Sequence, residues 1–169
     1  MRSLWMVGLV LLAGCLPSVG GTPTVVLPDA DTPTAEAVSA GLEAQAQANA
    51  DVEFVRAVQG ADGRWTFYVT VRHPDTGWED YADGWDVVLT DGTVLKPNPD
   101  SPFTRLLTHP HENEQPFTRS QSGITIPDGV TSVTVRAHDL RDGFGGREIV
   151  VDLMVSSGDG FVVEREGNN

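Results

Sequence analysis

The feature that most constrains this fold is the alternation of apolar and polar residues in short segments after residue 50. Residues 64–72, 131–138 and 147–155 each alternate with period two and are rich in β-branched and aromatic side chains. Such alternation is typical of half-buried β-strands. The chain shows no internal repeat and no long amphipathic helix. The sequence therefore predicts an all-β fold.

Turn residues separate these segments and set the boundaries of the expected strands. In chain order the strands are expected at about 51–59, 64–72, 85–90, 93–96 resuming at 104–108, 118–126, 131–138, 147–155 and 161–166. Short strands at this spacing favour an antiparallel sandwich of about seven to nine strands. The pattern resembles immunoglobulin-like or fibronectin type III-like sandwiches. It lacks the disulfide of antibody domains, because Cys15 is the single cysteine.

The first fifteen residues have the features of an export signal. Arg2 is followed by a short apolar stretch over residues 4–12, too short to span a bilayer. The end of this stretch, Leu12-Ala13-Gly14-Cys15, resembles the lipobox of bacterial lipoproteins. The resemblance implies cleavage before Cys15 and acylation of this residue, for example with palmitate, so that the chain is anchored in the cell envelope. In bacterial lipoproteins an aspartate directly after the acylated cysteine favours retention in the inner membrane. Leu16 stands at this position, which favours the outer membrane, either on its periplasmic face or at the cell surface.

Composition divides the rest of the chain into a tether and one domain. Residues 15–50 begin with the acylated terminus and are rich in Pro, Thr, Gly, Asp and Ala without periodicity, which predicts a flexible linker. Residues 51–169 are long enough for one sandwich domain with its own core. We thus expect a signal peptide at 1–14, a linker at 15–50 and a domain at 51–169. The formal net charge of −13 makes nucleic-acid binding an unsuitable function, since phosphate backbones would be repelled.

The connections between strands fall into two classes. Short turns of Asp, Gly and Pro lie at 60–63, 91–92 and 127–129, whereas residues 73–84, 109–117 and 138–146 form longer connections. Because successive antiparallel strands alternate in direction, the three longer loops are expected to meet at one end of the sandwich. We call these three segments the loop end. They carry all four histidines of the chain, His73, His109, His111 and His138.

The residue types at the loop end allow several chemistries. Imidazole with a carboxylate such as Asp139 suits a transition metal, possible ions being Zn or Cu. The acids of residues 78–86 offer a hard-cation alternative, and histidines beside proline can also simply bond loop carbonyls. A ligand or protein partner could instead contact the loop end through aromatic and acidic side chains, or the aromatics could cap the sandwich. The candidate contact residues are Trp78, Tyr81, Glu112 and Phe144.

Residues 69–153 also resemble an uncharacterised family of small bacterial envelope proteins. The resemblance is carried by HPDTGW, by HPH followed by EQPF, and by AHD. It implies no activity. The chain contains none of the G-x-S-x-G, P-loop or H-E-x-x-H motifs of enzymes. The sequence thus favours a non-catalytic module whose loop end binds a small ligand, an envelope protein or a transition metal, and the alternative is a metal-dependent periplasmic hydrolase or redox enzyme.

Overall fold

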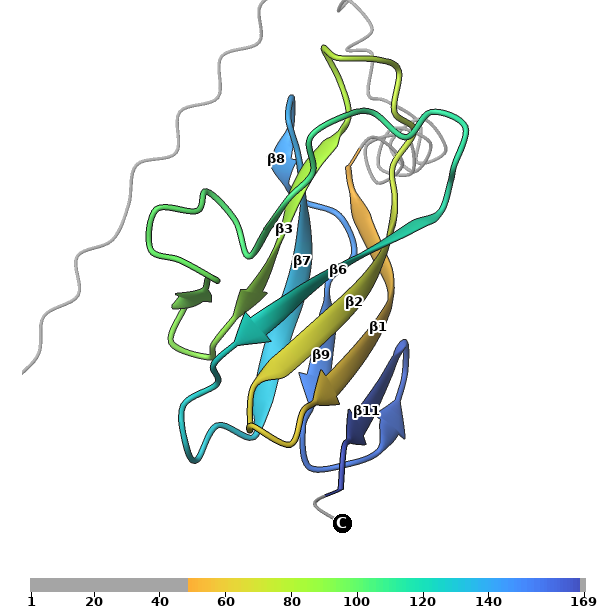
Figure 1. Cartoon of the computed structure of the whole chain (residues 1–169). Coiled ribbons are helices and arrows are strands. Elements are labelled where there is room, and N and C mark those ends of the chain that lie inside the picture. Colours follow the sequence, from red (N-terminus) through yellow and green to blue (C-terminus); the bar gives the residue numbers. More distant parts are fainter. Residues whose placement is uncertain (1–48, 168–169) are drawn as a thin grey trace, which may run out of the picture. The chain divides into compact units, whose positions relative to one another are not determined.

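The strands form two sheets that pack face to face, as the computed structural model of residues 49–167 shows (Figure 1). The predictions for residues 1–48, including the signal peptide and Cys15, lie outside the described residues. The five-stranded sheet has the order β10 (Ser157–Gly158), β11 (Phe161–Arg165), β1 (Asp51–Gln59), β2 (Trp65–Arg72) and β6 (Phe117–Ile124). The six-stranded sheet has the order β4 (Val94–Leu95), β3 (Ala82–Val88), β7 (Ser132–Asp139) and β8 (Gly143–Phe144), with β5 (Arg105–Leu106) beside β3 and β9 (Ile149–Asp152) beside β7. This arrangement confirms the predicted all-β sandwich.

The core lies between the sheets and follows the alternation of the sequence. In β2, every second residue from Trp65 to Val71 is buried, and β7 shows the same alternation. Trp85 in β3 is fully buried, as are Phe67 and Val135 from the facing sheets. Ala50, the last residue of the predicted linker, is 1% exposed and belongs to this core.

Strand β3 begins at Ala82, three residues before the predicted start. All seven of its residues are buried, so its sequence lacks the alternation that marks a half-exposed strand. Its edge pairs first with β5 and then with β4. Thr104 spans the interruption between them, because its hydroxyl accepts from the Val87 amide at 2.8 Å while its own amide donates to Asp86 at 3.0 Å. The predicted strand at 93–96 and 104–108 is therefore interrupted, as expected, although its two paired pieces are short.

Two features of the sheets differ from the sequence prediction. The structure has eleven strand segments in the described residues, because the short pieces β8 and β10 were not expected. Strand β11 lies parallel to β1, with Val55 opposite Phe161. This pairing adds one parallel strand to an otherwise antiparallel sandwich.

The long loops meet at one end of the domain, as the alternating strand directions predict (Figure 1). Backbone and side-chain hydrogen bonds join them. The His73 amide donates to Gln115 Oε1 at 3.0 Å, and the Leu140 amide donates to the Tyr81 carbonyl at 3.1 Å. The loop end is therefore one connected structure rather than three independent loops.

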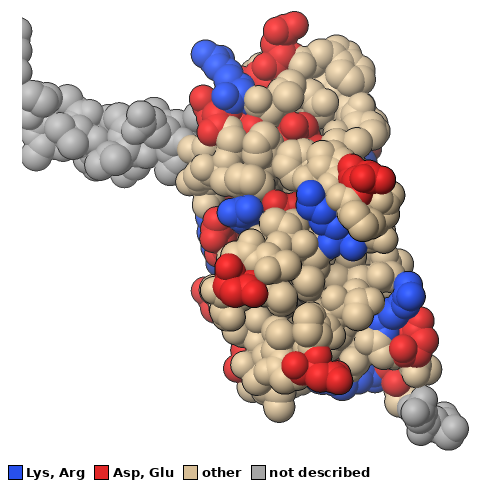
Figure 2. Space-filling view, turned by 90° about the vertical axis from the view of Figure 1, so that its left-hand side faces the viewer, with Lys and Arg blue, Asp and Glu red and all other residues tan. Residues whose placement is uncertain are grey.

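Charged side chains of both signs are interspersed on the face in Figure 2. That face presents no broad basic patch. Within residues 49–167, no helix is long and apolar enough to cross a membrane.

Candidate binding site at the loop end

The Asp75 carboxylate organises the loop end. Its side chain is fully buried, and its Oδ1 lies 2.6 Å from His73 Nδ1 and accepts from the Ala82 amide at 3.1 Å. Its Oδ2 accepts from the His111 amide at 2.6 Å. One carboxylate thus holds the loop after β2, the start of β3 and the loop before β6 together.

These hydrogen bonds keep Asp75 ionised. Burial raises the pKa of its carboxyl, but the hydrogen bonds from His73, His111 and Ala82 outweigh burial, and the pKa lies below its usual value. Because a carboxylate can only accept, the proton shared with His73 belongs to Nδ1 of the imidazole. The other ring nitrogen of His73, Nε2, therefore faces the remaining groups of the site.

Two further carboxyl groups surround His73 Nε2. Asp139 Oδ2 lies 3.2 Å away and Asp80 Oδ1 lies 3.8 Å away. His73 and Asp139 are buried, whereas the Asp80 side chain is 24% exposed. Ligand atoms of these three residues all lie within 4.8 Å of one another. Among the described residues, they form the group of histidine and acidic side chains that could share an ion.

Local turns direct the side chains of Asp80 and Asp139 toward His73. Asp139 ends β7, and its Oδ1 accepts from the Arg141 amide at 2.8 Å. The Asp80 carbonyl accepts from the Thr76 amide at 3.0 Å, and the Asp80 amide donates to the Gly77 carbonyl at 3.3 Å. Gly77 has a φ of +130°, which side chains with a Cβ rarely adopt. The glycine therefore allows the loop to turn back so that Asp80 approaches His73.

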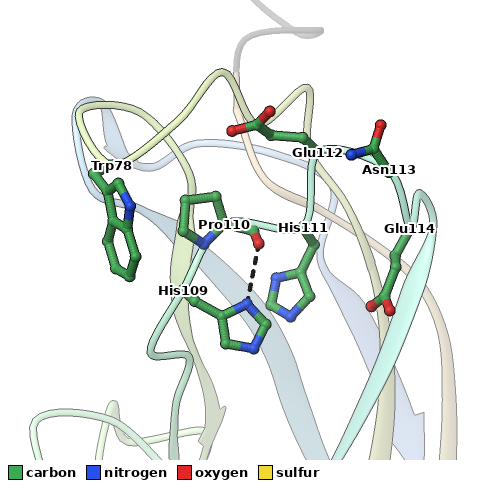
Figure 3. A pocket seen from close by; sticks show the side chains of 7 residues that line it. All are labelled: Trp78, His109, Pro110, His111, Glu112, Asn113 and Glu114. Atoms are coloured by element: carbon green, nitrogen blue, oxygen red, sulfur yellow. Dashed lines mark hydrogen bonds between the residues drawn. The ribbon is translucent and has the colours of Figure 1, made fainter.

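A second group of side chains surrounds an open pocket of about 470 Å³ (Figure 3). In Figure 3 the His109 and His111 rings lie side by side, with Trp78 on the opposite side of His109. The Trp78 side chain is 66% exposed and contacts Tyr81 edge to face at 6.0 Å. The pocket is lined by Trp78, His109, Pro110, His111, Glu112, Asn113 and Glu114.

His111 is buried at the base of this loop. Its ring stacks on Phe117 with centroids 3.8 Å apart, and neither ring nitrogen has a hydrogen-bond partner within the described structure. Burial is the main cause that lowers the pKa of His111, and the nearby charges of Arg119 and His109 lower it further, while Asp75 and Glu114 oppose them. His111 is therefore a neutral imidazole at neutral pH.

The neighbouring His109 is exposed and is held by its own loop. Its Nδ1 donates to the Pro110 carbonyl at 3.0 Å, which leaves Nε2 as an acceptor directed away from this bond. Arg119 donates a hydrogen bond to the Glu114 carboxylate at 3.0 Å, and this hydrogen bond lowers the pKa of Glu114. The pocket therefore combines an exposed indole, imidazoles and carboxylates.

His138 occupies a third position. Its Nδ1 lies 2.6 Å from Asp83 Oδ1, and its ring contacts Phe144 at 4.7 Å between centroids. The Arg136 guanidinium lies 3.9 Å from the centre of the same Phe144 ring. His138 of β7 and Phe144 of β8 thus form an aromatic cluster that is separate from the group around His73.

The structure brings together some of the predicted site residues and separates others. His73 and Asp139 meet, as do His109, His111, Glu112 and Trp78 around the pocket. The sequence prediction did not single out Asp80, which completes the group around His73, or Asp83, which pairs with His138. Both lie in the acidic run 78–86. Its hard-cation interpretation was the signal that could have pointed to Asp80.

Comparison with known proteins gives one informative match. The chain is 43% identical over 96 residues to a curated protein of Halomicrobium mukohataei named "Putative lipoprotein". The match covers 56% of this chain and 43% of that protein, so the chain spans less than half the length of this relative. No protein-family model matches the chain, and no solved structure matches it.

Proposed function

We propose that this protein is a lipid-anchored lipoprotein of the cell envelope that displays a non-catalytic β-sandwich module, and that the loop end of this module binds a ligand. The lipobox Leu12-Ala13-Gly14-Cys15 supports the anchor. The name of the relative from Halomicrobium mukohataei agrees with it. The immunoglobulin-like topology and the outer-membrane location stay predictions from the sequence.

The anchor can be tested directly by mass spectrometry. Intact-mass measurement of the membrane-bound protein should show loss of residues 1–14 and added acyl chains on Cys15. The variant Cys15→Ser should lack the acyl mass and should leave the membrane fraction, because an anchor of several acyl chains is what holds a soluble domain stably on a bilayer. Membrane retention of Cys15→Ser would contradict the anchor.

The observation that carries the binding function is the pocket beside Trp78. Although its ring contacts Tyr81, Trp78 is 66% exposed and presents most of its apolar surface to solvent. It stands next to hydrogen-bonding imidazoles and the exposed carboxylate of Glu112. This combination suits a ligand that has an apolar face, hydrogen-bonding groups and no net negative charge.

Calorimetric titration with three probe classes tests this function. The probes are a neutral oligosaccharide, a short basic peptide and an acidic peptide of equal length. We expect binding of a neutral or basic probe, weakened at least about tenfold by Trp78→Ala, as for an interface hot spot. The matched control Phe54→Ala removes an aromatic side chain that is 40% exposed on β1 and should leave binding unchanged. Binding that Trp78→Ala does not weaken, or binding of the acidic probe alone, would contradict the proposal.

A further inference from the structure

We propose that His73, Asp80 and Asp139 bind a divalent transition-metal ion, with Zn²⁺ as the ion to test first. This site is separate from the pocket beside Trp78 and uses none of the residues that line the pocket. The inference therefore goes beyond the proposed function, and each can fail without the other.

The hydrogen bonding of His73 is the first reason. Both ring nitrogens face carboxyl oxygens, with Asp75 at 2.6 Å from Nδ1 and Asp139 at 3.2 Å from Nε2. His73 Nε2 and Asp139 Oδ2 are both atoms that a transition metal accepts as ligands, and an ion lying between them would be bound by both.

The charge of the cluster is the second reason. Three carboxyl groups, those of Asp75, Asp80 and Asp139, surround one imidazole, and the side chains of Asp75 and Asp139 have no solvent exposure. Arg141 lies 3.9 Å from Asp80, but its side chain is 69% exposed. Burying several carboxylates close together costs free energy unless a positive charge compensates them. A divalent cation compensates them better than a single proton on His73 does.

The spacing of the donor atoms fits a shared metal. Zn²⁺ binds nitrogen and oxygen at about 2.0–2.2 Å in tetrahedral geometry, so two ligand atoms on one ion lie roughly 3.4 Å apart. The observed distances from His73 Nε2 to Asp139 and Asp80 are 3.2 Å and 3.8 Å. Small side-chain movements would therefore let the three side chains bind one ion, which would leave one of its four tetrahedral positions for another ligand.

The hydrogen bonding around His73 also resembles that of metal-binding histidines in other proteins. A carboxylate on one ring nitrogen fixes the tautomer and directs the other nitrogen at the metal. Asp75 holds this position, and its hydrogen bonds from Ala82 and His111 fix it in place. The imidazole favours a transition ion over Mg²⁺ or Ca²⁺, which prefer oxygen ligands alone. The Asp80 side chain is 24% exposed, so one of the three proposed ligands contacts solvent.

The experiment uses the full-length chain, purified in detergent without a histidine tag and stripped with a chelator. Zn²⁺ is titrated by calorimetry, and Co²⁺ is titrated by its visible absorption. The test variant is Asp80→Asn, since Asp80 is partly exposed and its substitution should leave the metal-free fold intact. The matched control is Glu79→Gln, which removes the same charge from an exposed residue of the same loop. Thermal unfolding of metal-free samples checks that both variants fold.

We expect one Zn²⁺ per chain and a loss of affinity of at least about tenfold in Asp80→Asn, with Glu79→Gln unchanged. A further variant, His109→Ala, should also retain full affinity, because His109 lies outside the group. Failure to bind Zn²⁺ or Co²⁺ in stoichiometric amount would overturn the proposal. Equal weakening by Asp80→Asn and Glu79→Gln would overturn it too, and so would a loss of binding in His109→Ala alone.

Discussion

Substitution of Asp75 by asparagine should destabilise the domain strongly, even without metal. The carboxylate accepts hydrogen bonds from His73 Nδ1, the Ala82 amide and the His111 amide, all in a buried setting. An asparagine side chain keeps one oxygen, but its amide nitrogen can only donate. At least one of the three buried donors must then face another donor.

The expected loss follows from these contacts. A hydrogen bond to a charged group contributes about 1.5–3 kcal/mol, and a buried donor left unsatisfied costs about 1–3 kcal/mol. Since the two effects overlap in one side chain, we expect Asp75→Asn to lower the free energy of unfolding by about 3 kcal/mol. This is a large part of the 5–15 kcal/mol that domains typically have.

Urea unfolding at pH 7 with a chelator present measures this loss. The matched control is Asp91→Asn, where an exposed aspartate accepts hydrogen bonds from Thr93, with the Thr93 amide at 2.9 Å. The control should be far less destabilised. Because the folded-state pKa of Asp75 is lowered, its stabilisation is complete above the pKa of an unfolded aspartate, about 4, and is lost as the pH falls further. An Asp75→Asn variant as stable as Asp91→Asn would refute the role of Asp75 as the group that joins the loops.

Two further substitutions test the packing of the domain. His111→Gln should reduce the loss of stability between pH 7 and pH 5, because the folded-state pKa of His111 is lowered and the unfolded chain therefore binds the proton more readily as the pH falls. Equal pH dependence of the urea midpoints in both proteins would contradict this. Gly84→Ala should destabilise the domain by about 1–3 kcal/mol, since an added Cβ would lie 2.2 Å from the Phe103 ring. The control is Gly167→Ala, because Gly167 has open space around it. Equal thermal midpoints of the two variants would contradict the prediction, because they would show that the Phe103 side chain moves away from the added methyl group at little cost.

The fold could be predicted where strands have one face in the core and one in solvent. The alternation in β2 and β7 is the direct result of this geometry. The start of β3 could not be found in this way, because both faces of that strand are covered. The pairing of β1 with β11 could not be predicted either, because it joins segments more than a hundred residues apart in the sequence. Two-residue strands such as β8 are too short to show any period.

The candidate site was predictable only to the level of its loops. Chain direction indicates that His73 and His138 should lie at the same end, and they do. Which carboxylate each histidine faces depends on how the loop 73–81 turns at Gly77, and no periodic pattern encodes that turn. Asp80 therefore looked like part of a solvated acidic run, although the turn places it 3.8 Å from His73 Nε2.

Backbone amide chemical-shift mapping during Zn²⁺ titration tests most directly whether the loop end binds a metal ion. The full-length chain in detergent micelles is the sample, and each amide of residues 49–167 reports its own environment. We predict saturable shifts within 73–84 and 138–146, and none at the turns 60–63, 91–92 and 127–129. Shifts that are absent, or that centre on those opposite turns, would contradict the assignment of a metal site to the loop end.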